Sequence, residues 1–138
     1  MGRYFSPDPG EKTPQSVLIV DDEPMARTLL RLMLVRAGFN VSEAENGSDA
    51  LAKVKKNRPD IVLLDVMMPG MDGFMVCESI RSQEDMANLP IIMLSAKTDL
   101  DSINRGLRLG ATKYLTKPIS PEDLTEHVRE ALENVTPA

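Results

Sequence analysis

The amino-acid sequence predicts an α/β fold, with a doubly wound sheet of parallel strands and helices packed on both of its faces. Short apolar runs alternate with amphipathic segments from residue 16 to residue 134, a pattern typical of repeated βαβ units. The strongest runs are apolar at every position, which indicates strands that are buried on both faces of a parallel sheet. The length of 138 residues fits one domain.

Five segments are predicted to be strands. Three of them are short, apolar and rich in β-branched residues, namely residues 17–20 (VLIV), 61–64 (IVLL) and 91–94 (IIML). Two weaker candidates, residues 40–44 and 112–115, carry polar residues and are expected at the edges of the sheet. With the first, third and fourth strands in the centre and right-handed crossovers, the strand order is 2-1-3-4-5. This is the flavodoxin-like order.

Five helices are predicted to connect and follow these strands. The first begins at Pro24 and ends before Gly38, because proline favours the first helical position and glycine the position just past the last. A shorter helix around Ala50 stops before Pro59, and a third spans residues 73–81. The pattern therefore supplies one helix for each of the first three strands.

The last two helices show clear helical periodicity. Leu100, Ile103 and Leu107 recur at spacings of three and four and are followed by Gly110, which indicates a helix that ends there. The fifth helix begins after Ser120, a residue type that caps helix N-termini. Five βα units thus account for the whole apolar pattern of the chain.

The domain is predicted to span residues 16–134. Residues 1–15 contain three prolines and no apolar period, so we expect a flexible N-terminal arm there, and residues 135–138 are expected to form a short C-terminal tail. The single cysteine, Cys77, excludes an internal disulfide.

Composition excludes several classes of function. The net charge of −5, the aromatic content of 4% and the absence of tryptophan argue against direct binding of nucleic acid. No apolar run approaches the roughly 18 residues that a membrane-spanning helix needs. No signal peptide is visible, so a cytoplasmic location without membrane contact is the simplest expectation.

Reactive side chains follow the carboxyl ends of four predicted strands. Asp21 and Asp22 follow the first strand, Asp65 the third, Ser95 the fourth and Lys117 the fifth. Ligands bind doubly wound sheets at this edge, where the strand order reverses between strands one and three. Clustered carboxylates repel each other unless a cation joins them, and oxygen ligands with open positions suit Mg²⁺. Carboxylates, a divalent metal, a hydroxyl and an ammonium group together predict a site for a phosphoryl group, with one carboxylate as the nucleophile.

The chain resembles the receiver domain of bacterial two-component response regulators over residues 16–134. The resemblance rests on four segments, namely residues 20–23 (VDDE), 64–73 (LDVMMPGMDG), 94–96 (LSA) and 110–118 (GATKYLTKP). Each segment alone is unspecific, because acidic, hydroxyl and lysine side chains often lie in solvated loops. Their combination at four strand ends is highly specific.

The resemblance implies an acceptor and its metal site. Asp65 would accept a phosphoryl group from a sensor histidine kinase or a phosphotransfer protein. Asp22 and Asp65 would ligate Mg²⁺ directly, together with the backbone carbonyl of Met67, and Asp21 would act mainly through a metal-bound water. The domain would be a phosphoacceptor switch and not an enzyme.

The resemblance also implies residues that sense the phosphoryl group. Ser95 and Lys117 would contact the phosphoryl oxygens, and Tyr114 would be the aromatic switch residue. The signal would pass to a downstream effector protein or to a fused output domain. Phosphorylation could also drive the formation of a homodimer.

Two other classes stay open. A pseudo-receiver is a protein-interaction module that shares the fold and is never phosphorylated, but it normally lacks part of the site. An enzyme of the haloacid-dehalogenase type also uses an aspartate nucleophile and Mg²⁺. Such enzymes place a second aspartate two residues after the nucleophile, where this chain has Met67, and this counts against that class.

Overall fold

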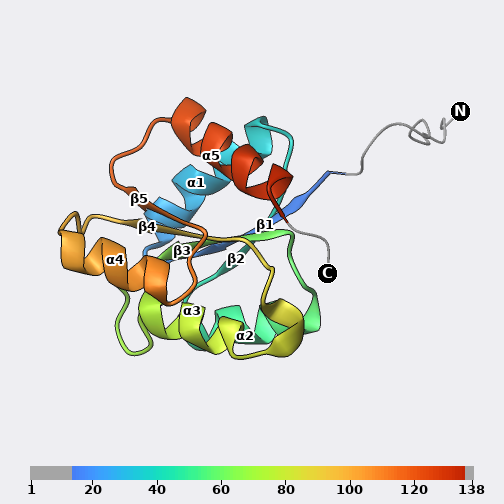
Figure 1. Cartoon of the computed structure of the whole chain (residues 1–138). Coiled ribbons are helices and arrows are strands. Elements are labelled where there is room, and N and C mark those ends of the chain that lie inside the picture. The colour runs from blue at the N-terminus through green and yellow to red at the C-terminus, as the bar shows by residue number, and fades with distance from the viewer. Residues whose placement is uncertain (1–13, 136–138) are drawn as a thin grey trace, which may run out of the picture.

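Figure 1 shows a computed structural model of the protein, which describes residues 14–135. Five parallel strands form one sheet in the order β2-β1-β3-β4-β5, and five α-helices alternate with them. The predicted fold class and strand order are therefore confirmed. The predicted arm lies outside the described residues except for Pro14 and Gln15, as does the predicted tail except for Val135.

The elements have the following bounds. The strands are β1 (Ser16–Val20), β2 (Asn40–Ala44), β3 (Ile61–Asp65), β4 (Ile91–Ser95) and β5 (Lys113–Thr116). The helices are α1 (Pro24–Arg36), α2 (Gly47–Lys56), α3 (Gly73–Arg81), α4 (Leu100–Arg108) and α5 (Pro121–Glu133). A short 3₁₀ helix, η1 (Glu84–Met86), precedes β4. It was not predicted, because three residues are too few to show a period.

The strand pattern follows from burial. Every residue of β3 and β4 is buried, whereas β2 alternates between exposed and partly buried positions until it ends. Edge strands face solvent along one side, so the polar residues of β2 and β5 fit their observed edge positions. The fifth strand begins one residue later than predicted, at Lys113. The side chain of Thr112 accepts a hydrogen bond from the backbone N–H of Ile91 at 3.0 Å, and so caps the start of the strand.

Two apolar layers hold the helices to the sheet. Helices α1 and α5 cover one face, and helices α2, α3 and α4 cover the other (Figure 1). Successive strand residues point to opposite faces, so Leu18 and Val20 pack in one layer while Val17 and Ile19 pack in the other. Because both faces of the sheet are covered by helices, the central strands need apolar residues at successive positions, as the sequence pattern indicated.

Side-chain caps define where four helices begin. The side chains of Asn46, Asp72, Asp99 and Ser120 each accept a hydrogen bond from the backbone N–H three residues later. Such caps satisfy amide groups that have no partner inside the helix, and each contributes about 1 kcal/mol. Helix α1 has no side-chain cap and instead begins at Pro24. Within residues 14–135, no helix is long and apolar enough to cross a membrane.

Candidate functional site

Three aspartates meet at the carboxyl edge of the sheet, between β1 and β3. Asp21 and Asp22 directly follow β1, and Asp65 is the last residue of β3. Because Val20 pairs with Leu64 in the sheet, the acids that follow these two residues lie side by side. A carboxylate oxygen from each aspartate lies within 4.8 Å of the other two. The predicted convergence of these side chains is therefore present in the structure.

The three carboxylates differ in exposure. The Asp21 side chain is 3% exposed and that of Asp65 is 10% exposed, whereas Asp22 faces solvent. The backbone N–H of Glu23 donates a hydrogen bond to Asp21 Oδ1 at 2.9 Å, and the backbone N–H of Met67 donates to Asp65 Oδ1 at 3.3 Å. Backbone groups thus orient the two buried carboxylates, and Asp22 lies on the solvent-exposed side of the cluster.

Lys117 brings a positive charge to this acid cluster. It follows β5, and its backbone N–H donates to the carbonyl oxygen of Ser95 at 2.8 Å, which holds the residue against the end of β4. Its Nζ lies 3.4 Å from Asp21 Oδ2 and 3.8 Å from Asp65 Oδ1. One ammonium group therefore serves two buried carboxylates.

The surroundings of Asp65 raise the pKa of its carboxyl group. Burial raises its pKa from 3.8 to about 6, and the charges of Asp21 and Asp22 act in the same direction. The ammonium of Lys117 and the N–H of Met67 lower the pKa and offset part of this effect. The local charge of three carboxylates and one ammonium favours a further cation. A set of carboxylate oxygens, one of them exposed, has the chemistry that Mg²⁺ prefers.

Ser95 ends β4 at the same edge of the sheet. Asp65 pairs with Leu94, so Ser95 is the next residue along the neighbouring strand. The serine is fully buried, and its Oγ accepts a hydrogen bond from the backbone N–H of Lys97 at 3.0 Å. The structure thus brings a buried hydroxyl to the carboxyl edge of the sheet that holds the aspartates, as the strand pattern predicted.

Tyr114 lies on β5, the edge strand that pairs with β4 on the side away from the acid cluster. Its ring packs against α4, where a Cβ on Gly106 would lie 2.9 Å from the tyrosine Cδ2. Its hydroxyl donates a hydrogen bond to the backbone carbonyl of Lys97 at 2.9 Å. The backbone of Lys97 therefore connects Ser95 to Tyr114. No sequence signal marks this connection, because every residue carries the same backbone groups.

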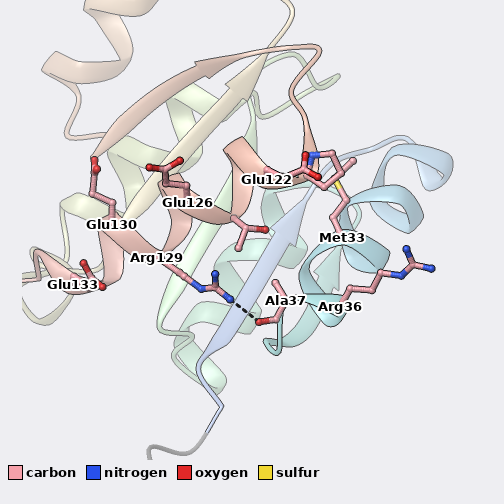
Figure 2. A pocket seen from close by; sticks show the side chains of 10 residues that line it. Met33, Arg36, Ala37, Glu122, Glu126, Arg129, Glu130 and Glu133 are labelled. Carbon is pink, nitrogen blue, oxygen red and sulfur yellow. Dashed lines mark hydrogen bonds between the residues drawn. The ribbon is translucent and has the colours of Figure 1, made fainter.

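A separate groove lies between α1 and α5 (Figure 2). Arg129 donates a hydrogen bond to the carbonyl oxygen of Ala37 at 3.1 Å, and Glu122 and Glu126 contribute carboxylates from α5. Residues of these two helical segments line the groove, whereas the aspartates follow strand ends. The acid cluster is therefore the candidate site.

This fold and this acid cluster define a receiver-type signalling domain. The chain belongs to the response regulator receiver domain family, whose model matches residues 17–129. The predicted resemblance to two-component response regulators is thus confirmed.

Curated relatives share the domain. The chain is 42% identical over 118 residues to the DNA-binding response regulator MtrA of Mycolicibacterium smegmatis, a match that covers 86% of this chain and 50% of the relative. It is also 42% identical over 118 residues to the alkaline phosphatase synthesis transcriptional regulatory protein PhoP of Bacillus subtilis, with 86% and 48% covered. The chain spans about half the length of these relatives.

Solved structures agree with the fold. A putative response regulator from Chloroflexus aurantiacus matches with a TM-score of 0.84 and 38% identity, over 88% of this chain and 99% of that one. The chemotaxis protein CheY4 of Vibrio cholerae matches with a TM-score of 0.82 and 36% identity, over 86% and 98% of the two chains.

Proposed function

We propose that residues 16–134 form a phosphorylation switch of a two-component system, in which Asp65 accepts a phosphoryl group from a histidine kinase or phosphotransfer protein. The observation that carries this proposal is the contact of Lys117 with two of three clustered aspartates at the switch point of the sheet. Asp65 is the proposed nucleophile because it ends β3 within the acid cluster, lies 3.8 Å from Lys117 Nζ, and is the residue to which the resemblance to receiver domains assigns the phosphoryl group.

The acid cluster fits Mg²⁺. Asp22 and Asp65 would hold the ion directly, with the backbone carbonyl of Met67, and Asp21 would act mainly through a bound water. When bound, the ion supplies positive charge that neutralises the transferring phosphoryl group. The exposed position of Asp22 leaves the site open to solvent and to the donor.

The residues of the chain have separate tasks in the transfer. An oxygen of the ionised Asp65 carboxylate attacks phosphorus, the bond from phosphorus to the donor imidazole breaks, and the imidazole takes up a proton as it leaves. The Asp65 carboxylate becomes an acyl phosphate. Lys117 Nζ pairs with the phosphoryl oxygens and Ser95 Oγ donates to one of them, so charge and position are set by the protein.

The change at the site would be passed on through Ser95. If its hydroxyl turns to the phosphoryl group, the Lys97 backbone loses or shifts its hydrogen bond to Oγ, and the Lys97 carbonyl moves the hydroxyl of Tyr114. New contacts in one state and not the other are what a two-state switch requires. Helix α4, which packs against the Tyr114 ring, would carry the change to the surface.

The output is proposed by analogy with the relatives. The two curated relatives named above are about twice as long as the matched region and are named as regulators of transcription or binders of DNA. We propose that this domain controls an effector protein or a fused output domain, or forms a phosphorylation-dependent homodimer, in the cytoplasm. Its own charge of −5 disfavours direct contact with nucleic acid.

Magnesium is expected to stabilise the folded protein through this cluster. At about ten times its dissociation constant, a ligand of the native state adds roughly 1.4 kcal/mol, which raises Tm by several degrees. Asp22→Asn should lose most of this gain. The matched control Asp85→Asn removes an acid from η1, which precedes the amino end of β4 at the opposite edge of the sheet from the cluster, and should keep it. A thermal melt with and without Mg²⁺ tests this, and an equal gain in the Asp22 variant would contradict it.

Phosphorylation itself is tested by incubating the protein with acetyl phosphate and Mg²⁺ and measuring its intact mass. The wild type and Asp85→Asn should gain the mass of one phosphate. Asp65→Asn, and the wild type with a chelator, should gain none. If the wild type gains no phosphate under conditions that label a known receiver domain, the chain is a pseudo-receiver and the proposal is wrong.

A further inference from the structure

The side chain of Arg27 joins the acid cluster to the edge of the sheet. It lies in the first turns of α1 and is 15% exposed. Its Nη1 donates a hydrogen bond to the backbone carbonyl oxygen of Asp21 at 2.7 Å, and its Nε donates to Glu43 Oε1 on β2 at 3.1 Å. One guanidinium group therefore connects α1, β2 and the residue that follows β1.

The carbonyl that Arg27 holds belongs to the peptide between Asp21 and Asp22. In the preceding peptide, between Val20 and Asp21, the backbone N–H of Asp21 donates to the carbonyl oxygen of Ala44 at 3.2 Å. Strand β1 ends at Val20, so the Asp21 carbonyl lies just past the ladder of the sheet. A peptide group is planar, and an oxygen held at one place fixes the direction in which Asp22 leaves the strand. The relative placement of the two acids therefore depends on Arg27.

Glu43 in turn holds the guanidinium in place. Its Oε1 accepts from Arg27 and its Oε2 accepts from Arg31 at 2.8 Å. The two-pronged shape of the guanidinium lets Arg27 reach a carbonyl and a carboxylate at once, which the single ammonium of a lysine cannot reproduce. Arg31 pairs with the same glutamate, and within residues 14–135 it makes no hydrogen bond with Asp21.

We infer that Arg27 is a positioning residue for the cation site: it orients the Asp21–Asp22 peptide so that both carboxylates face one ion. This inference rests on the proposed function, in which the cluster holds Mg²⁺. Partners that orient metal ligands in this indirect way affect metal affinity in many proteins, although they never touch the metal.

The positive charge of Arg27 and its hydrogen bond to the Asp21 carbonyl predict opposite changes in Mg²⁺ affinity when Arg27 is replaced. By Coulomb's law, removal of a positive charge near a cation site strengthens cation binding. Loss of the hydrogen bond to the Asp21 carbonyl weakens binding, because the peptide between the acids is free to turn. Arg27→Lys keeps the charge and removes only the two-pronged contact, whereas Arg27→Gln removes both.

The test is calorimetric titration of the full chain with Mg²⁺, without any phosphodonor. We expect the dissociation constant of Arg27→Lys to rise about tenfold over the wild type. The matched control Arg31→Lys makes the same substitution at the same glutamate and should bind Mg²⁺ as the wild type does. Unfolding in urea is followed for each variant, because a purely structural role would lower stability and leave the dissociation constant unchanged.

The outcomes separate this inference from the proposed function. Wild-type affinity in Arg27→Lys overturns the inference and leaves the magnesium site standing. A wild type that binds no Mg²⁺ overturns both. If circular dichroism shows that Arg27→Lys is unfolded, Arg27→Gln replaces it. Weaker Mg²⁺ binding by Arg27→Gln supports the inference, because loss of the positive charge alone would strengthen binding. Tighter or equal binding overturns the inference.

Discussion

Gly73→Ala is expected to lower the free energy of unfolding by about 3 kcal/mol, at the upper end of the usual cost of overpacking. Gly73 is the first residue of α3, and its backbone N–H donates to the carbonyl oxygen of Val66 at 2.9 Å. A Cβ at this position would lie 2.5 Å from the carbonyl oxygen of Asp65 and 2.7 Å from the Cα of Val66. These are backbone atoms at the end of β3, so either α3 or the end of β3 must move.

Gly47→Ala is the matched control for this substitution. Gly47 is the first residue of α2, so both changes gain the same helix propensity. The added Cβ would lie 2.8 Å from the Sδ of Met71 and 2.9 Å from its Cγ and its Cβ. The thioether end adapts to new neighbours, whereas the Cβ moves only with its backbone, which lies in the loop between β3 and α3. We expect a loss of about 1–2 kcal/mol by urea unfolding with an unchanged m-value, which is smaller than the loss for Gly73→Ala because the atoms that must move belong to a loop and not to β3. Equal stability of the two alanine variants would show that the contact between α3 and β3 is loose.

Asp65→Asn is expected to raise the free energy of unfolding at neutral pH in metal-free buffer. Burial and the neighbouring acids raise the pKa of Asp65 from 3.8 to about 6, so the ionised carboxylate opposes folding. A raised pKa means that the native state binds the proton more tightly than the unfolded state. Asp65 therefore costs nothing below about pH 4, and its cost grows as the pH rises and is complete above about pH 7.

The size of the effect follows from the pKa. One pKa unit corresponds to about 1.4 kcal/mol, and because solvent at the mouth of the site screens part of the charge, we expect a gain of about 1–3 kcal/mol. Lys117→Met should act in the opposite direction, since it leaves the carboxylates without their ammonium partner. Urea unfolding at pH 4 and pH 7.5 in a chelator tests both variants. A gain in Asp65→Asn that is equal at the two pH values would show that the carboxylate charge is not its cause.

The sequence predicts every strand of this fold to within one residue at each end. The buried strands β1, β3 and β4 are apolar at almost every position, because both of their faces are covered. Strand β5 has partly buried and exposed residues, and it lies one residue later than predicted at both ends. Local pattern thus locates buried and edge strands alike, whereas the residue at which each strand begins or ends depends on hydrogen bonds that form only in three dimensions.

The site shows the same division. The meeting of Asp21, Asp22 and Asp65 follows from strand order alone, because residues after parallel neighbours share an edge. The reach of Arg27 to Glu43 depends on side-chain conformation and on how α1 sits over β2, which no local pattern records. Gly73 was assigned only to the start of a helix, and its close approach to β3 appears only in three dimensions.

The central claim is that Asp65 forms an acyl phosphate, and its location is measured most directly by borohydride trapping. Borohydride reduces an aspartyl phosphate to homoserine, and tandem mass spectrometry of the digested protein then reads the modified position. After treatment with acetyl phosphate and Mg²⁺, we predict homoserine at position 65 and unmodified aspartate at positions 21 and 22. Phosphate on a hydroxyl or imidazole side chain, or reduction at another acid with position 65 intact, would contradict the assignment of Asp65 as the acceptor.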